Sequence, residues 1–372
     1  MDNYNLVCIR TAPNPNPRIV RLVTVAEEVG LKTLYLGAVR EKNLAKNEIV
    51  NDIPVQRIGR FYPMLNGKGL VTYLLGTLLF NLAVFKFLIK TRPEIVHVSD
   101  VESFPCSILY KLIFRKKLLY NIHDNFSQRY SLPNFANNFL NFMEGVFVML
   151  SSVTIVPEDF RARSLPGFCQ GKIKIVRNSP MDLEVFLPQK ITETEEIVII
   201  YSGWIDSKRG VEELLKVADR IDGIRIIVVG EGDPKLIEIM KNHKKCDYRG
   251  FIPYKDSISL LKEAHFVYIH YSPERLINRF AAPNKLPESL AAGRIPIINS
   301  EIVLSKKVVD FDCGVVSSYG DEDSLYEKIT ALRKSPLKYQ SMCTNARRLF
   351  DKEYSWVSIK ASTVLALKEV NK

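Results

Sequence analysis

The sequence has few of the residues that cross-link small exported proteins or hold metal ions. Its 372 residues include 6 cysteines and 5 histidines, and no two cysteines stand in a Cys-x-x-Cys pair. This pattern argues against a disulfide scaffold and a zinc finger, and it is typical of a protein kept in the reducing cytosol. No basic segment with a following apolar run precedes the strand-like residues 5–9, so no signal peptide is expected.

Long uncharged stretches are also scarce. The longest covers residues 69–85, which is 17 residues, and it includes Thr72, Thr77 and Asn81. A helix that crosses a bilayer needs about 20 mostly apolar residues. We therefore expect a helix that is buried or lies against a membrane surface.

The chain has an excess of positive charge, and most of it lies in the first half. The net charge is +11; residues 1–185 carry 23 Lys and Arg against 15 Asp and Glu, and residues 186–372 carry 29 against 26. A basic half predicts an anionic partner, either lipid headgroups or nucleic acid. We expect no nucleic acid, because the basic residues are dispersed among predicted helices instead of forming a stripe with aromatic residues.

Short β-branched runs alternate with longer helical patterns, which predicts parallel sheets covered by helices. The expected strands are residues 6–9, 33–36, 55–58, 95–98, 118–122, 153–156, 198–202, 224–229, 247–249, 266–269, 295–298 and 314–316. The expected helices include residues 19–29, 70–90, 135–150, 211–218, 257–263 and 285–292. Two such series predict an α/β protein with two doubly wound domains, whose ligands lie at the carboxyl ends of the strands.

Prolines and polar residues interrupt this pattern between residues 176 and 190. We therefore place the first domain at residues 1–185 and the second at residues 186–355. The helix expected at residues 356–372 is predicted to pack back on the first domain. The cleft between the two domains is the expected site.

Three segments of the second half each follow a predicted strand. Gly203 is followed by Lys208-Arg209-Gly210, a second strand ends at Gly230, and residues 283–293 open a helix that contains Glu288. Each segment alone is most often an ordinary turn or helix start. Together they suit a nucleotide diphosphate, because cations and free backbone N–H groups bind phosphates and a carboxylate accepts both ribose hydroxyls.

These segments resemble glycosyltransferase family 4, whose members are retaining enzymes with two facing Rossmann-like domains, the GT-B architecture. Residues 283–298 resemble its donor motif most specifically, and residues 208–210 resemble its basic loop. Further similarity lies in residues 17–19, 97–102, 120–124 and 176–178. Residues 97–102 and 120–124 resemble strand-end motifs of a subgroup that builds surface polysaccharides.

The resemblance implies a role for each matched residue. Arg209, with Lys208, would bind the diphosphate, Glu288 would bind the ribose, and His123 would face the reacting sugar beside Asp124. The remaining residues implied are Gly203, Gly230, Asn284, Lys285 and Leu286 on the donor side and Arg18 on the acceptor side.

Two positions depart from the family. Trp204 stands where many members carry a second cation, and Phe280 stands where an acidic residue is common. Glu274 is the nearest upstream acid and is kept as a catalytic candidate. His123 could equally be a hydrogen-bonded structural histidine, and His97, inside a predicted strand, is expected to be structural.

No metal or other cofactor is expected. The acidic triplets 310–312 and 321–323 could be read as a metal-binding Asp-x-Asp, but they follow the donor motif. The second triplet also precedes a helical run, where acidic residues cap helices.

The sequence and the resemblance thus predict a cytoplasmic enzyme, peripheral at the inner face of the cell membrane, that acts in bacterial surface polysaccharide synthesis. It would pass a sugar from a nucleotide-diphosphate donor to a glycan or lipid-linked acceptor. Two alternatives remain: a nucleotide-sugar isomerase of the same architecture, for which only Asp124 is a well-placed carboxylate, and a catalytically silent, nucleotide-sugar-binding partner subunit.

Overall fold

The computed structural model describes residues 4–39, 44–60, 70–99, 101–129, 132–181, 191–192 and 195–371. The chain divides into two compact units, one of Met1–Arg177 with Ile359–Lys372 and one of Asn178–Ser358. The boundary expected between residues 185 and 186 lies outside the described residues. That the two domains face each other across a cleft stays a prediction.

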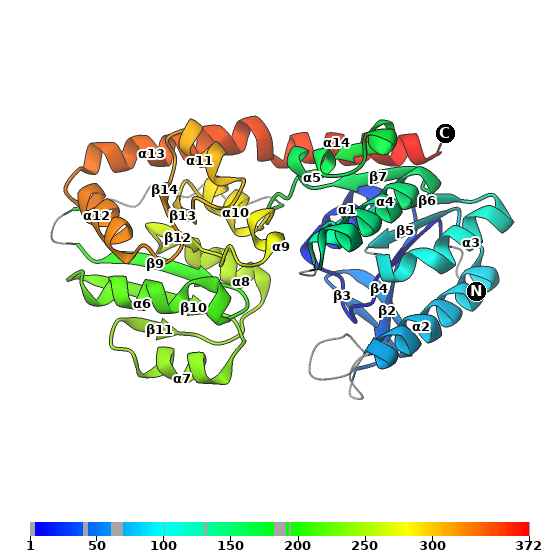
Figure 1. Ribbon diagram of the computed structural model, residues 1–372, viewed down its shortest axis with the longest axis horizontal. Helices are drawn as coiled ribbons and strands as arrows, with labels where there is room; N and C mark the ends of the chain where they lie inside the picture. The colour runs from blue at the N-terminus through cyan, green and yellow to red at the C-terminus, as the bar shows by residue number, and fades with distance from the viewer. Residues whose placement is uncertain are drawn as a thin grey trace. The chain divides into compact units, whose positions relative to one another are not determined.

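The first unit is built on an eight-stranded sheet in the order β3-β4-β2-β1-β5-β6-β7-β8, parallel except for the β3–β4 pair (Figure 1). Its strands are β1 Leu6–Ile9, β2 Thr33–Val39, β3 Asn47–Val50, β4 Ile53–Arg60, β5 Ile95–Ser99, β6 Lys117–Asn121, β7 Val153–Val156 and β8 Ile173–Ile175. Its helices are α1 Pro17–Glu28, α2 Leu70–Thr91, α3 Phe104–Phe114, α4 Asn134–Leu150 and α5 Asp159–Arg163. Helix α14, Trp356–Asn371, begins in the second unit and continues into the first.

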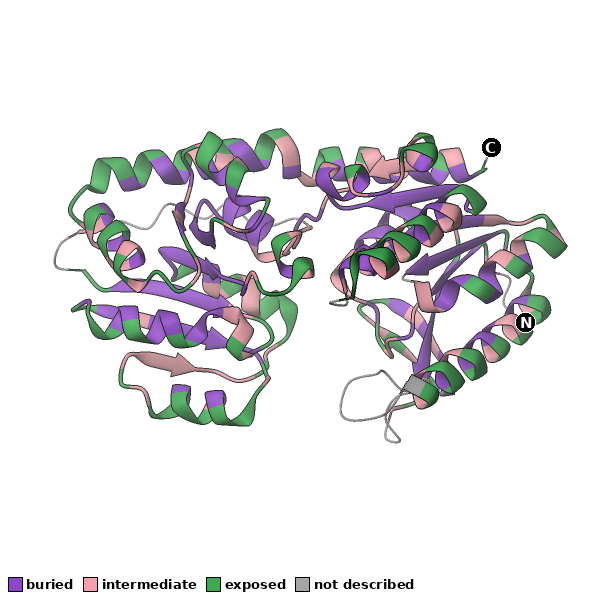
Figure 2. Cartoon of the chain, in the orientation of Figure 1, coloured by how far each residue is buried: buried purple, intermediate pink, exposed green. Residues whose placement is uncertain are grey.

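One core of the first unit lies between the sheet and the layer of α2, α3 and α4, and α1 and α14 bury further residues such as Leu22 and Leu367. Phe80 of α2, Phe104 of α3 and Val148 of α4 share a buried cluster with strand residues such as Val7 and Val96. Three consecutive right-handed crossovers place these helices on the same face of the sheet. Strands are largely buried, whereas the helices expose their outer sides (Figure 2).

Helix α14 is joined to the first unit by two ion pairs. Lys360 pairs with Glu28 of α1 at 2.6 Å, and Lys174 of β8 pairs with Glu369 at 3.0 Å. Thr363, Leu367 and neighbouring residues on one side of the helix are buried.

Helix α2 is longer than the uncharged stretch from which it was expected. Residues Val71–Thr91 form, within the described part of the chain, one helix long and apolar enough to cross a membrane by length and composition. The helix expected at residues 70–90 is confirmed as Leu70–Thr91, and it continues beyond the uncharged stretch through Lys86 and Lys90. Length and composition alone do not show that it spans a bilayer.

The second unit contains a six-stranded parallel sheet in the order β11-β10-β9-β12-β13-β14. Its strands are β9 Ile197–Ser202, β10 Ile224–Val229, β11 Cys246–Tyr248, β12 Phe266–Ile269, β13 Ile295–Asn299 and β14 Val315–Ser317. Its helices are α6 Val211–Asp219, α7 Pro234–Asn242, α8 Tyr254–Ser259, α9 Leu276–Arg279, α10 Lys285–Ala291, α11 Ser305–Asp310, α12 Glu322–Arg333 and α13 Pro336–Leu349.

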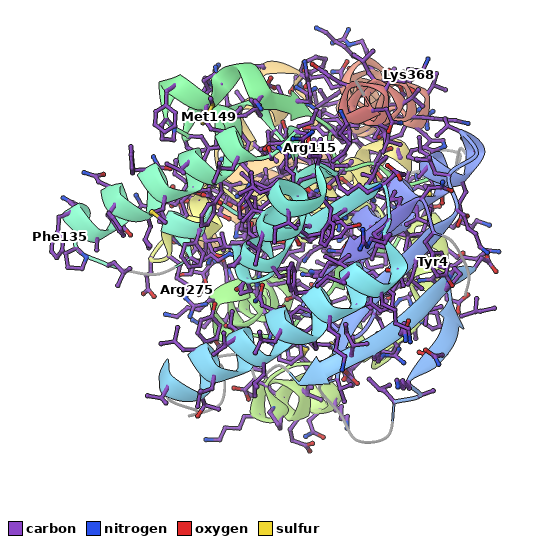
Figure 3. All side chains as sticks on the ribbon, turned by 90° about the vertical axis from the view of Figure 1, so that its right-hand side faces the viewer. Tyr4, Arg115, Phe135, Met149, Arg275 and Lys368 are labelled. Carbon is purple, nitrogen blue, oxygen red and sulfur yellow. The ribbon has the colours of Figure 1, made fainter. Side chains whose placement is uncertain are left out.

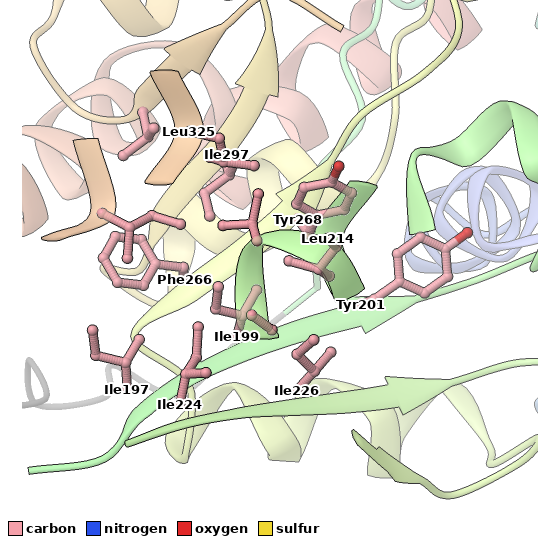
Figure 4. Close-up of a cluster of buried hydrophobic side chains, with 14 of the residues drawn as sticks. Ile197, Ile199, Tyr201, Leu214, Ile224, Ile226, Phe266, Tyr268, Ile297 and Leu325 are labelled. Carbon is pink, nitrogen blue, oxygen red and sulfur yellow. The ribbon is translucent and has the colours of Figure 1, made fainter. Parts of the chain in front are cut away.

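Alternating strand residues build the core of the second unit. Ile199, Ile226 and Phe266 point from the sheet toward Leu214 of α6 and Leu325 of α12 (Figure 4). Apolar side chains fill this core, and polar side chains follow the carboxyl ends of β9, β10 and β12. The expected doubly wound fold is therefore present in both units.

Candidate functional site

The strand order of the second sheet reverses at β9, which lies between β10 and β12. Ligands of doubly wound sheets bind at the carboxyl ends of strands beside such a reversal. Gly203 follows β9 and Gly230 follows β10, and a Cβ on Gly230 would lie 1.9 Å from the carbonyl oxygen of Gly203. Only glycine permits this approach, which brings two backbone segments together beneath the expected donor position.

Two cations share an aromatic ring beside these glycines. The Arg209 guanidinium lies 4.2 Å from the centre of the Tyr271 ring. The Lys285 amino group lies 4.3 Å from the Tyr201 ring and 5.6 Å from the Tyr271 ring, and its side chain is the nearest atom group to the position a Gly203 Cβ would take. Arg209 and Lys285 therefore form a compact positive site at the strand ends, which suits a diphosphate.

Burial, followed by the nearby charge of Arg209, lowers the pKa of Lys285 to about 7, and Glu288 partly opposes this shift. The charged form of a buried amine beside another cation is disfavoured until an anion binds. The cluster is thus prepared for a negatively charged ligand.

The loop that carries Arg209 is held by several hydrogen bonds. The Asp206 carboxylate accepts from the Lys208 N–H at 2.7 Å, and the Lys208 carbonyl accepts from the Ser272 N–H at 2.8 Å. Gly210 takes a left-handed conformation with φ 65°, and its carbonyl accepts from the Tyr268 hydroxyl at 2.8 Å. These contacts fix the backbone on both sides of Arg209.

Lys208 and Glu274 form an exposed ion pair with each other. The structure therefore places Glu274 beside the basic loop, next to the cation that was expected to help Arg209 bind phosphate. The catalytic role of Glu274 and the phosphate-binding role of Lys208 stay predictions.

Glu288 is buried on α10, and its carboxylate accepts a hydrogen bond from the Tyr254 hydroxyl at 2.9 Å. Asn284 directly precedes this helix, and Lys285 is its first residue. Leu286, also expected on the donor side, is fully buried, and its contact with a donor stays a prediction.

The sequence did not indicate a buried polar cluster beneath the basic loop. His270 Nδ1 lies 3.0 Å from Glu213 Oε2, and the Tyr268 hydroxyl donates to the same oxygen at 3.1 Å. The sequence analysis also did not single out Tyr201 and Tyr271, whose rings contact Lys285 and Arg209. Their one signal in the sequence is their position at or just after the end of a predicted strand, where a tyrosine also fits a core.

In the first unit, His123 follows β6 and lies beside the start of α1. Its Nδ1 is 3.3 Å from Asn16 Nδ2, and Arg18 donates to the neighbouring Ile122 carbonyl at 3.4 Å. Asn16 itself caps α1 by accepting from the Ile19 N–H at 3.0 Å. An Asn-Pro pair before a helical run is a recognised helix start signal, so the sequence could have revealed that Asn16 caps α1.

Burial, then the charges of Arg18 and Arg10, lower the pKa of His123 well below its ordinary range. The imidazole is therefore neutral at pH 7. Its Nε2 atom is buried and has no hydrogen-bond partner among the residues that the structure describes. The contact with Asn16 fits a structural histidine and the unpartnered Nε2 fits a functional one, so both interpretations of His123 stay predictions.

Asp124 accepts a hydrogen bond from Arg161 Nη2 at 2.7 Å, and Arg161 is buried. His97 is buried inside β5 with its Nε2 3.2 Å from Asn121 Nδ2, as expected for a structural histidine. Asp124 is thus held in an ion pair next to His123.

The described residues contain no group of three or more His, Cys, Asp and Glu side chains that could hold a metal ion. In the triplet 321–323, Asp321 caps α12 by accepting from the Ser324 N–H at 3.0 Å, which confirms the capping interpretation. The metal-free reaction stays a prediction.

Residues 185–349 match the family profile described as glycosyl transferases group 1. This stretch contains Gly203, Arg209, Gly230, Lys285 and Glu288, the donor-side residues described above. The protein is a glycosyltransferase. No curated protein sequence matches it.

Solved structures share the fold of this glycosyltransferase over nearly its whole length. Sucrose-phosphate synthase from Thermosynechococcus elongatus is 14% identical with a TM-score of 0.78, covering 98% of both chains. Anabaena HepE in complex with UDP and glucose is 15% identical with a TM-score of 0.72, covering 98% of this chain and 99% of its own. The lipopolysaccharide outer core galactosyltransferase WaaB is 12% identical with a TM-score of 0.65, covering 97% and 98%. These likenesses show the GT-B fold.

Proposed function

We propose that the glycosyltransferase takes its sugar from a nucleotide-diphosphate donor and transfers it to a glycan or lipid-linked acceptor, in the synthesis of a bacterial surface polysaccharide. The observation that carries this proposal is the cluster of Arg209, Lys285 and Tyr271 at the ends of β9 and β12. The complexes of HepE with UDP and with UDP-glucose support a nucleotide sugar as the donor. WaaB, a lipopolysaccharide galactosyltransferase, supports a surface glycan as the acceptor.

The proposed reaction retains the anomeric configuration and needs no metal ion. As the bond between the sugar and the diphosphate breaks, negative charge grows on the departing oxygen. Arg209 is permanently charged, and Lys285 becomes fully charged once an anion lies beside it. Two fixed cations at this position would stabilise the leaving group where other enzymes use a metal.

The isomerase alternative has less support. Such an enzyme needs a carboxylate that exchanges protons with the substrate. Asp124 is the one candidate that the sequence offered, and it is paired with the buried Arg161. The Asp124 carboxylate is thus already engaged by a cation of the protein itself. The silent partner subunit remains an outcome of the test below.

Calorimetry with UDP-, GDP- and ADP-sugars in excess EDTA tests the donor site. We expect one nucleotide series to bind and Glu288→Ala to weaken it, since the carboxylate would accept the ribose hydroxyls. Losing a hydrogen-bonded charged group typically costs about 1.5–3 kcal/mol, or roughly tenfold to a hundredfold in affinity.

Glu327→Ala, an exposed glutamate on α12, is the matched control and should bind as the wild type does. If no nucleotide sugar binds the wild type, the proposal is wrong. Binding without hydrolysis or transfer by the wild type would favour the silent partner subunit.

A further inference from the structure

The outer side of the helix layer in the first unit is apolar across three helices. Large exposed side chains include Leu74, Leu78 and Leu82 on α2, Leu112 on α3, and Phe135 and Phe139 on α4. Leu112 is 63% exposed and Phe135 is 78% exposed. Figure 3 looks onto this layer and shows Phe135 projecting from the end of α4.

The three helices are held side by side by contacts beneath this surface. The Phe104 ring of α3 stacks on Phe147 of α4 with ring centroids 4.4 Å apart. The Asn81 amide of α2 donates to the Glu102 carbonyl and accepts from the Cys106 N–H, which ties α2 to the start of α3. Soluble monomers rarely expose apolar patches larger than a few hundred Å², so an exposed layer of this kind indicates an interaction surface.

Helix α2 is apolar on two opposite sides. Phe80, Val84 and Leu88 are fully buried in the core of the first unit, while Leu78 and Leu82 point outward. A helix fixed to a folded domain along one side cannot span a bilayer without unfolding that domain. The outward side can lie in the boundary between headgroups and acyl chains, as interfacial helices do.

Positive charge borders the apolar surface at the C-terminal ends of α2 and α3. Lys86, Lys90 and Arg115 are exposed there, and Arg92 reaches from the end of α2 over the Phe114 ring of α3 at 4.3 Å. We call these residues the basic edge. Cations at helix C-termini favour the helix dipole, but that effect does not account for the exposed leucines beside them.

Within the described residues of α2, α3 and α4, the single carboxylate is Glu144, and it is buried. The exposed charge on these three helices is therefore cationic, and Glu94, which follows α2, is exposed and pairs with Lys116. Anionic headgroups complement such a surface, with about 1 kcal/mol contributed by each basic side chain near them.

We propose that this surface docks the first unit on an anionic lipid bilayer, with Leu74, Leu78 and Leu82 at the acyl boundary and the basic edge against the headgroups. His123 follows the carboxyl end of β6, the edge of the sheet opposite the basic edge. The docking surface would thus leave that edge uncovered. This proposal does not depend on the proposed reaction, because vesicle binding requires no donor.

Co-sedimentation of the full chain with vesicles tests the proposal. Vesicles of phosphatidylcholine alone are compared with vesicles that also contain phosphatidylglycerol, without donor and at low salt. We expect preference for the anionic vesicles, weakened by salt. Leu78→Glu with Leu82→Glu should reduce binding about tenfold or more. Leu337→Glu, which alters a leucine 83% exposed on α13, should bind as the wild type does.

Separate variants test the contribution of the basic edge to vesicle binding. Lys86→Gln with Lys90→Gln should remove most of the preference for anionic vesicles, whereas Lys235→Gln with Lys334→Gln in the second unit should keep it. Unchanged thermal melting and nucleotide binding in every variant show that the fold is intact. The proposal is overturned if the wild type ignores anionic vesicles, if the leucine variant binds them normally, or if those leucines hold a dimer that does not bind vesicles.

Discussion

At the residue scale, Arg209 combines a fixed position with a permanent charge. Its backbone is held through Lys208 and Gly210, and its guanidinium lies against Tyr271. The donor's diphosphate is already anionic before reaction, so Arg209 contributes to ground-state binding. The charge that appears on bond cleavage makes the same contact stronger in the transition state.

Arg209→Ala should therefore lower kcat more than it raises KM. Removing one such group typically costs about 10²–10³ in rate, or roughly 2.7–4 kcal/mol. Steady-state kinetics of donor turnover give both parameters. Arg275→Ala, an exposed arginine on the loop before α9, serves as the control. A raised KM with unchanged kcat would mean that Arg209 only holds the donor.

Lys285 should make donor binding depend on pH. Its pKa is about 7 in the free protein, and a bound diphosphate raises the pKa of a neighbouring amine. Below pH 7 the amine is already charged, so affinity should change little. Above pH 7 binding must take up a proton, and affinity should fall by up to about tenfold per pH unit.

Calorimetry with an intact nucleotide sugar measures this dependence, because its diphosphate does not titrate near neutral pH. Lys285→Arg keeps the charge at every pH and should bind with a flat profile. A flat profile in the wild type would show that Lys285 does not meet the diphosphate.

At the element scale, the junction of β9 and β10 depends on a close backbone contact. Gly230 has φ 142°, and a Cβ there would collide with the Gly203 carbonyl. Gly230→Ala should destabilise the second unit by more than about 2 kcal/mol and abolish nucleotide binding. Thermal melting and calorimetry measure the two effects.

Gly320→Ala isolates the steric part of this result. Gly320 also has a positive φ, 82°, but nothing lies within 4 Å of the position its Cβ would take. The Gly320→Ala variant should lose about 1–2 kcal/mol of folding stability and bind nucleotide normally. If both variants lose the same stability, the positive φ of Gly230, and not the contact with Gly203, accounts for the effect of Gly230→Ala.

Several elements could be predicted because their signal is local. Buried parallel strands such as Ile224–Val229 are rich in β-branched residues, and they were found with little error. β3, Asn47–Val50, was missed because its polar residues make an antiparallel edge without an apolar run. β8, Ile173–Ile175, was also missed, because Lys172 and Lys174 interrupt its apolar residues.

The site was predictable to a smaller extent. Arg209 and Glu288 belong to short motifs next to strand ends, so the sequence could name them as candidates, and their roles stay predictions. The contacts between Lys285 and Tyr201, and between His270 and Glu213, join residues far apart in the chain. Such contacts depend on the strand order of the sheet, which no local pattern encodes.

At the scale of the whole molecule, each unit supplies one kind of chemistry. The second unit holds a cationic cluster for an anionic donor, and the first holds a neutral imidazole, His123, with one nitrogen free of partners among the described residues. The first unit also carries the apolar layer and its basic edge. Donor chemistry and membrane contact would thus belong to different domains of one glycosyltransferase.

The central claim is that cationic side chains replace a metal ion in transferring a sugar from a nucleotide diphosphate. Turnover of the nucleotide sugar that binds, followed as release of nucleotide diphosphate in excess EDTA, tests it most directly. We predict that the wild type keeps its full rate in EDTA and that Arg209→Ala loses about 10²–10³ of it. Activity that disappears in EDTA and returns only with Mg²⁺ or Mn²⁺ would contradict the account.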